Sequence, residues 1–258
     1  MDWKEFYSRE RRLRHIEIFE EVRSRLKEND PEADAMLNQG GLLSFPHTFL
    51  DHSMVPVVRT VCAVKRKRGE TIVGLGPLHF VNIGSYDDEF CLDLLEHVVN
   101  VSNEIDPEVH LDLKKVVLPI NYAEEKTIEE TLERCRKETE VVRDMMIDGS
   151  IMALTGDLVH YGHGYGMVID VADVEQQYME WVREQLDLAY VKKDHYALRD
   201  KAFKVLNDQT RPMIVASTIL GEHLEYKIFS HCLSDYSLIL DTEAPTYVAS
   251  IFYGVHPV

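Results

Sequence analysis

The chain has 258 residues, of which 45% are hydrophobic and 28% charged, a composition typical of a folded globular protein rather than a disordered or fibrous one. Its 45 acidic residues outnumber the 28 basic ones, and the formal net charge of -17 repels phosphate backbones and anionic lipid head groups. We therefore expect no nucleic-acid partner and no membrane partner.

Two further features bear on the compartment of the protein. The first residues contain no apolar run of signal-peptide length, and no later stretch offers the roughly 18 apolar residues that a membrane helix needs. The cysteines lie far apart without a CxxC pair, which favours reduced thiols over disulfides or a thiolate zinc site: Cys62, Cys91, Cys135 and Cys232. We expect a cytoplasmic protein.

The first 26 residues show the pattern of an amphipathic helix. From Trp3 to about Leu26 the apolar residues recur at three- and four-residue steps among charged ones. Pro31 and a glycine pair then end this helical extension, which spans residues 1–41. Its apolar face could serve as a partner or dimer surface, so a homo-oligomer is possible.

From residue 42 onward, short apolar runs alternate with long amphipathic ones, which is typical of βα units around a largely parallel sheet. We predict strands over residues 42–45, 71–75, 116–120, 150–155 and 247–253. We predict helices over residues 55–66, 89–101, 128–147, 174–189, 195–206 and 213–233. No long linker interrupts the chain, so residues 1–258 are expected to form a single α/β domain with its core at 42–258.

Two predicted strands run into a proline and then a histidine. The stretch SFPH ends at His47, and TIVGLGPLH ends at His79. Ligands bind at the carboxyl ends of strands in open α/β sheets, and neutral imidazole is a common ligand of Fe, Zn and Cu. The two histidines could share a metal; alternatively, each caps its strand and bonds a loop.

A third predicted strand, SIMALT, leads into GDLVHYGHGYG, the densest polar cluster of the chain. We expect Asp157 and His160 to lie on one face of a first helical turn, where the carboxylate can orient the ring. His160 could then act as a general acid or base, or as a further metal ligand. The alternative is a mobile glycine-rich surface loop. No P-loop, GxSxG or HExxH sequence occurs.

The order of FPH, GLGPLH, EVHL and GDLVHYG along the chain resembles the Memo family, which is structurally related to the class III extradiol dioxygenases. The resemblance covers roughly residues 42–166. It implies a three-layer α/β/α fold with a mixed, largely parallel sheet, and it places His47 and His79 at the two metal-site histidines of the family. Glu108 and His110 match the ExH pair, while Phe80 stands where the family has a second histidine.

The resemblance also places Asp157 and His160 at the later Asp and His of the family. Where Memo proteins have a cysteine that opens a late helix, this chain reads DQTRPM, so Asp208 takes the place of the third metal ligand. With His47 and His79 it would complete the two-histidine, one-carboxylate triad of non-haem Fe(II) oxygenases. Glu222 and Glu243 are the alternative carboxylates.

The leading hypothesis is an Fe(II)-dependent oxygenase, dioxygenase-like, that uses dioxygen and a small organic substrate, aromatic compounds included, with His160 and Asp157 as catalytic residues. Zn or Cu are alternative metals. The expected substrate pocket comprises Phe49, Phe80, His110, Tyr161, His163 and Tyr165. A non-catalytic Memo-like binding or scaffold protein and a Zn-dependent hydrolase are the two alternative functions.

Overall fold

The computed structural model describes residues 3–47, 49–78, 90–119, 127–166 and 171–258. Its strands are β1 (Leu42–Phe45), β2 (Thr71–Leu78), β3 (Asp112–Pro119), β4 (Ser150–Thr155), β5 (Val159–Gly162), β6 (Leu224–Asp235) and β7 (Thr246–Pro257). Its α-helices are α1 (Trp3–Leu13), α2 (His15–Arg25), α3 (Pro31–Asn38), α4 (Leu50–Arg66), α5 (Phe90–Ile105), α6 (Ile128–Met145), α7 (Val171–Leu186), α8 (His195–Val205), α9 (Thr210–Leu220) and α10 (Ser237–Leu240). A 3-10 turn, η1 (His163–Tyr165), follows β5, and a π-helical turn, η2 (Asp187–Val191), extends α7.

The strands of the described residues form one mixed seven-stranded sheet in the order β3-β2-β4-β1-β7-β5, and β6 pairs with the other edge of β7. The first four strands in this order run parallel to one another. The long strand β7 runs antiparallel to β1, β5 and β6. Because β1, β2, β3 and β4 are parallel, their carboxyl ends meet at one edge of the sheet, where sites in α/β proteins form.

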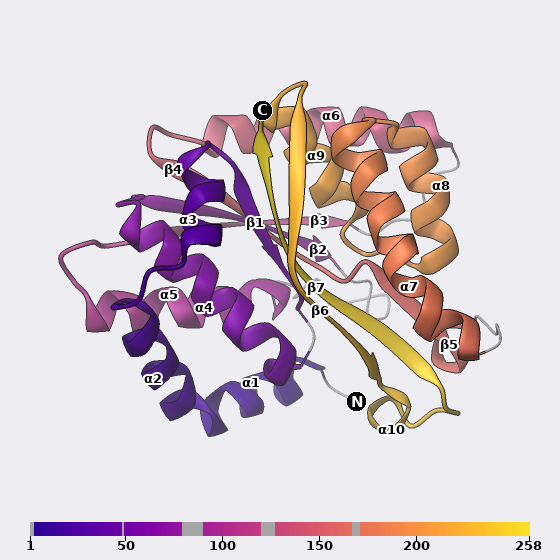
Figure 1. Ribbon diagram of the computed structural model, residues 1–258, viewed down its shortest axis with the longest axis horizontal. Helices are drawn as coiled ribbons and strands as arrows, with labels where there is room; N and C mark the ends of the chain where they lie inside the picture. Colours follow the sequence, from indigo (N-terminus) through magenta and orange to yellow (C-terminus); the bar gives the residue numbers. More distant parts are fainter. Residues whose placement is uncertain (1–2, 48, 79–89, 120–126, 167–170) are drawn as a thin grey trace.

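Helices cover both faces of the sheet, which confirms the expected three-layer α/β/α arrangement (Figure 1). The alternation of side chains along each strand divides the core: Leu43 of β1 and Ala153 of β4 face the layer of α2, α3, α4 and α5. Leu42 and Leu154, one residue away on the same strands, face the layer that contains α7, α8 and α9. Buried apolar side chains on both faces of the sheet therefore fix the positions of the strands and of their carboxyl ends.

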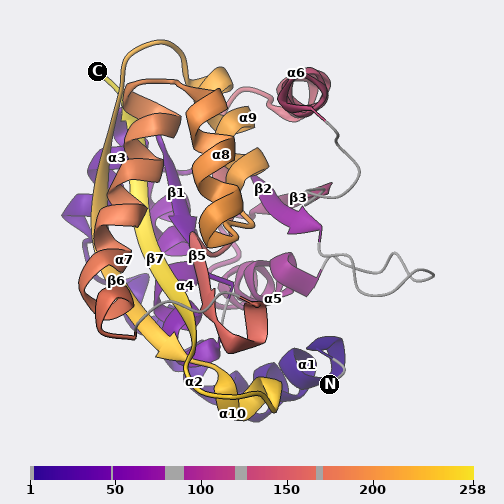
Figure 2. The same cartoon turned by 90° about the vertical axis from the view of Figure 1, so that its right-hand side faces the viewer.

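The segment before β1 belongs to the packed core. Ile18 and Val22 of α2 and Leu37 of α3 are fully buried in the cluster that also contains α4 and α5. The sequence predicts one helix over residues 3–26, whereas the structure has two, divided at Arg14. Helices α1, α2 and α10 all lie at the lower end of the molecule (Figure 2).

One predicted helix is wrong. Residues 213–233 were expected to be a single helix, but α9 ends at Leu220 and the chain turns at Gly221 with φ of 107°. Residues from Leu224 onward then form β6, which pairs with β7 along its whole length. None of the helices that the structure describes is both long enough and apolar enough to cross a bilayer.

Candidate metal centre

Two neighbouring parallel strands deliver His47 and Asp157 to the same place. Phe45 at the end of β1 is in register with Thr155 at the end of β4. The Gly156 N–H donates to the Phe45 carbonyl at 3.3 Å, so the two chains stay together for one more residue. His47 and Asp157 follow directly, side by side at the carboxyl edge of the sheet.

The turn between α8 and α9 brings Asp208 to the same point. Its Oδ1 accepts a hydrogen bond from the Asp157 N–H at 2.7 Å. Gly156 allows this close approach, because a Cβ at that position would lie 2.7 Å from the Gln209 Cβ and 2.8 Å from Asp208 Oδ1. The φ of 149° at Gly156 also lies in a region that other residues rarely adopt.

The three side chains form a compact, buried group. His47 Nε2 lies 3.2 Å from Asp208 Oδ2 and 3.5 Å from Asp157 Oδ2. One ligand atom from each residue falls within 4.8 Å of the other two. The exposed fractions of the side chains are only 8% for His47, 2% for Asp157 and 5% for Asp208. This buried cluster can bind a metal ion.

His160 faces the same carboxylates from β5. Its Nε2 lies 3.6 Å from Asp208 Oδ2 and 4.0 Å from Asp157 Oδ2. Its Nδ1 lies 2.7 Å from the Leu206 carbonyl, and because a carbonyl only accepts, Nδ1 must carry the proton. In the neutral ring, the Nε2 lone pair therefore points toward the carboxylates, as it does in metal-binding histidines that are oriented by a backbone carbonyl.

The electrostatics of the cluster are unfavourable without a cation. Burial and the neighbouring charge of Asp208 raise the pKa of Asp157 well above its ordinary value. Burial, with the charges of Asp157 and Asp208, also raises the pKa of Tyr165. The Tyr165 ring packs edge-on against His160 with 5.1 Å between ring centroids. Tyr165 is therefore a neutral hydrogen-bond donor beside the site.

The residues fit a divalent metal on two counts. Asp157 Oδ1 is buried, and no group among the described residues forms a hydrogen bond with it, which is costly for a carboxylate. Ligand atoms about 2.1 Å from one metal lie about 3.0 to 3.4 Å apart. The distances from His47 Nε2 to Asp208 and Asp157, 3.2 and 3.5 Å, are close to that range.

A buried polar network that the sequence did not predict supports the turn around Asp208. Asn207 donates to Gln185 Oε1 at 2.7 Å and accepts from the Gln209 N–H at 2.7 Å. Gln209 donates to Ser44 Oγ at 2.7 Å and accepts from the Tyr253 hydroxyl at 2.7 Å. All five side chains are completely buried. The polar run NDQ directly before the apolar helix α9 was the available signal for this network.

The structure does not bring every expected pocket residue to this edge. Tyr161 follows His160 on β5, so it faces the opposite side of the sheet and packs on Trp181 with 5.7 Å between ring centroids. His110 precedes β3 and lies at the amino edge of the sheet, where it is 70% exposed and 3.5 Å from Asp112. The expected first helical turn at Asp157 is wrong, because β5 begins at Val159.

The remaining expected residues occupy varied positions. The Phe49 ring packs against Tyr236 with 4.4 Å between centroids. His163 is partly exposed and lies 3.7 Å from Glu243, an alternative carboxylate that is itself 79% exposed. Glu222 is exposed and follows the C-terminal end of α9, whereas Asp208 precedes the N-terminal end of that helix. His79 and Phe80 lie outside the described residues.

Comparisons with known proteins give no assignment for this chain. No protein-family model matches it. No curated protein matches it either.

Proposed function

We propose that the protein is a metal-dependent enzyme whose divalent cation is held by His47, Asp157 and Asp208, with His160 as a fourth group. The observation that carries the proposal is the burial of two carboxylates and two imidazoles around one point at the carboxyl edge of the sheet. Such a concentration of like charge is costly unless a cation binds there.

Among metals, we propose Fe(II) for this donor set. A mixture of imidazole and carboxylate ligands, without a thiolate, is typical of non-haem iron oxygenases, whereas thiolates favour softer metals. When bound, Fe(II) would supply the redox chemistry for an oxygenase reaction between dioxygen and a small organic substrate. His160 and Tyr165 lie beside the site and are suited to hold or move a substrate proton.

We also propose that the chain is a divergent, cytoplasmic member of the Memo family. Support comes from residues that the resemblance places at metal-site or neighbouring positions: His47, Asp157, His160 and Asp208 lie together although they are far apart in sequence. None of the four cysteines forms a disulfide in the structure, in keeping with a reducing compartment.

The first experiment measures metal content. Protein purified anaerobically and supplied with Fe(II), Mn(II) or Zn(II) should bind about one equivalent, with Fe(II) bound in preference to Mn(II). His47→Ala and Asp208→Asn should each abolish this binding, whereas the matched histidine variant His110→Ala should retain it. Metal binding that survives both site variants, or no binding by the wild type, would overturn the proposed centre.

The second experiment tests the reaction class. Iron-loaded protein should consume oxygen with at least one compound from a set of phenols, catechols and amino compounds, and the Asp208→Asn variant should not. A metal-dependent hydrolysis that runs equally well without oxygen would contradict the oxygenase assignment but leave the metal centre in place.

A further inference from the structure

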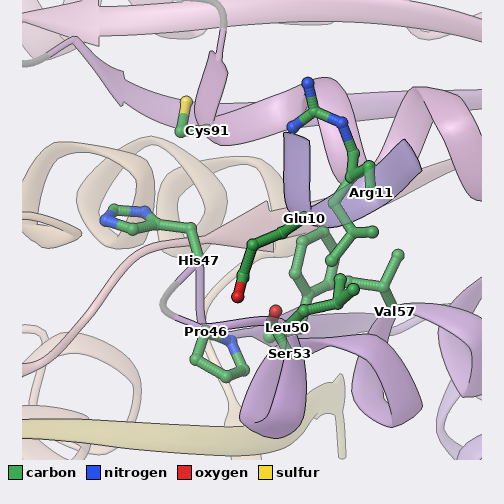
Figure 3. Close-up of a pocket in the computed structure, with 10 residues that line it drawn as sticks. Glu10, Arg11, Pro46, His47, Leu50, Ser53, Val57 and Cys91 are labelled. Carbon is green, nitrogen blue, oxygen red and sulfur yellow. The ribbon is translucent and has the colours of Figure 1, made fainter. Parts of the chain in front are cut away.

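A small pocket, shown in Figure 3, adjoins the candidate metal centre through a shared residue. His47 belongs to both. Helix α1 covers the pocket and contributes Glu10 and Arg11, and the wall and floor are mostly apolar: Phe45, Pro46, Leu50, Val57, Cys91 and Leu94. The salt bridge between Arg11 and Asp93 of α5, at 3.0 Å, fixes α1 over this pocket.

Glu10 brings an unsatisfied acceptor into the pocket. Its Oε2 is buried and has no hydrogen-bond partner among the described residues. In Figure 3 the Glu10 carboxylate points toward Pro46 and Ser53, whereas the guanidinium of Arg11 points away from it. A buried carboxylate oxygen in apolar surroundings needs a donor to offset its loss of hydration.

Among the described lining residues, the side-chain donors other than His47 are directed elsewhere, and the His47 ring points away from the Glu10 carboxylate (Figure 3). The Ser53 hydroxyl donates to the Phe49 carbonyl at 2.9 Å, and a hydroxyl has no second proton to give. The Cys91 thiol donates to the Pro77 carbonyl at 3.3 Å. The Arg11 guanidinium is paired with Asp93. No described side chain of the lining donates to Glu10, so a molecule that enters this pocket has to supply that hydrogen-bond donor.

Size and charge narrow the class of molecule. The cavity has a volume of about 20 Å³, enough for one group the size of a water molecule. An ammonium group has that size and carries only donors. The protein has a formal net charge of -17, which raises the local concentration of cations and repels anions.

We propose that this pocket holds the ammonium group of a small primary amine, with Glu10 as its counter-ion, so that the rest of the molecule extends past His47 toward the metal centre. The assignment of this pocket as a subsite for the substrate rests on the proposed function. Binding of the amine itself needs only Glu10 and the pocket, so the two proposals can fail separately.

The test is a titration of EDTA-treated protein with methylammonium chloride at constant ionic strength, followed by NMR shifts of the backbone amides of Leu50 and Ser53. A ligand of two heavy atoms is expected to bind with a Kd on the order of 10 mM. Glu10→Gln, which keeps the shape but removes the charge, should weaken binding at least about fivefold. Tetramethylammonium, a cation without N–H donors, should not bind.

Two control variants show whether a change in methylammonium binding is specific to Glu10. Glu5→Gln, at an exposed position on the same helix, should leave methylammonium binding unchanged. Asp208→Asn should also leave it unchanged even where metal binding is lost. Equal affinity in the wild type and Glu10→Gln, equal binding of tetramethylammonium, or no shift at concentrations about ten times the expected Kd would each overturn the ammonium subsite.

Discussion

Asp157 and Asp208 are joined by two reciprocal hydrogen bonds, one of them to the Asp208 side chain. The Asp157 N–H donates to Asp208 Oδ1 at 2.7 Å, and the Asp208 N–H donates to the Asp157 carbonyl at 3.2 Å. This reciprocal pair fixes the two carboxyl groups close together in a buried site, where their like charges repel each other. Because of this pair, two substitutions of Asp208 differ in their effect on the hydrogen bond. Asp208→Asn keeps an acceptor oxygen for the Asp157 N–H, whereas Asp208→Ala removes it.

The first prediction concerns the cost of that arrangement. Asp157→Asn removes one of the two buried charges, so we expect it to stabilise the metal-free protein by about 1–2 kcal/mol, or roughly 2–8 °C in Tm. The same substitution should abolish binding of the metal. Calorimetry in EDTA and a metal titration measure the two effects. A variant that is less stable than the wild type in EDTA would show that Asp157 has a structural role instead.

The second prediction concerns the polar network beneath Asp208. Asn207→Ala leaves Gln185 Oε1 and the Gln209 N–H without their partner, at a cost of about 1–3 kcal/mol in unfolding free energy. Because the network orients a ligand, metal affinity should also fall about 10–100-fold. Urea unfolding and metal titration provide the measurements.

Asn103 offers a matched control for that variant. Its side chain bonds both the N–H and the carbonyl of Leu111 at 2.9 Å, near the opposite edge of the sheet. Asn103→Ala should lower stability to a similar extent without changing metal affinity. If both variants weakened metal binding equally, the effect of Asn207 would be one of general stability.

The third prediction concerns His160. Its Nδ1 donates to the Leu206 carbonyl, which directs Nε2 at the two carboxylates. We expect His160→Ala to weaken metal binding at least about tenfold, since it removes a potential ligand. His195, which is also part-buried and hydrogen-bonded to Ser217 at 3.0 Å, provides a control whose alanine variant should bind metal normally. Unchanged affinity in His160→Ala would limit this residue to proton transfer.

The fourth prediction concerns acid stability. Burial alone would raise the pKa of Asp30, but hydrogen bonds from Arg59 and the Ala33 N–H outweigh it and lower the pKa below its ordinary 3.8. The stability that this carboxylate contributes is therefore complete above pH 3.8 and disappears as the pH falls through the lowered pKa.

Asp30→Asn tests this pH dependence. The variant should be less stable than the wild type at neutral pH, and the difference should shrink below a pH of about 3.8 as Asp30 itself becomes protonated. Urea unfolding at a series of pH values measures it, with the exposed Asp144→Asn as a reference. A difference that stays constant down to the acid transition would contradict the assignment.

Much of the site could be predicted because the sequence pattern marks where the strands end. The patterns over residues 42–45 and 150–155 match β1 and β4, and parallel strands carry the residues that follow them to one edge. His110 shows the limit of such reasoning, because it precedes β3 and so lies at the amino edge. Tyr161 shows another, because a short strand turns alternate residues to opposite faces.

The errors in secondary structure have a local cause. The segment from Met213 to Leu233 contains many apolar residues, and its first half is a helix, so its composition predicts one helix over the whole segment. The signals against it were Gly221 and the alternation of Leu224, Tyr226 and Ile228 with charged residues. Pairing with β7, which local sequence does not reveal, decides the outcome.

The position of β1 also affects when the site can form. Leu43 is in register with Ala153 of β4 on one side and with Gly254 of β7 on the other. The strand that carries His47 at its end is thus completed by pairing with residues synthesised much later, a feature of high contact order that slows folding. We expect a nascent chain to be unable to bind metal until β7 has left the ribosome. Metal binding would then show that the strands of the sheet have paired.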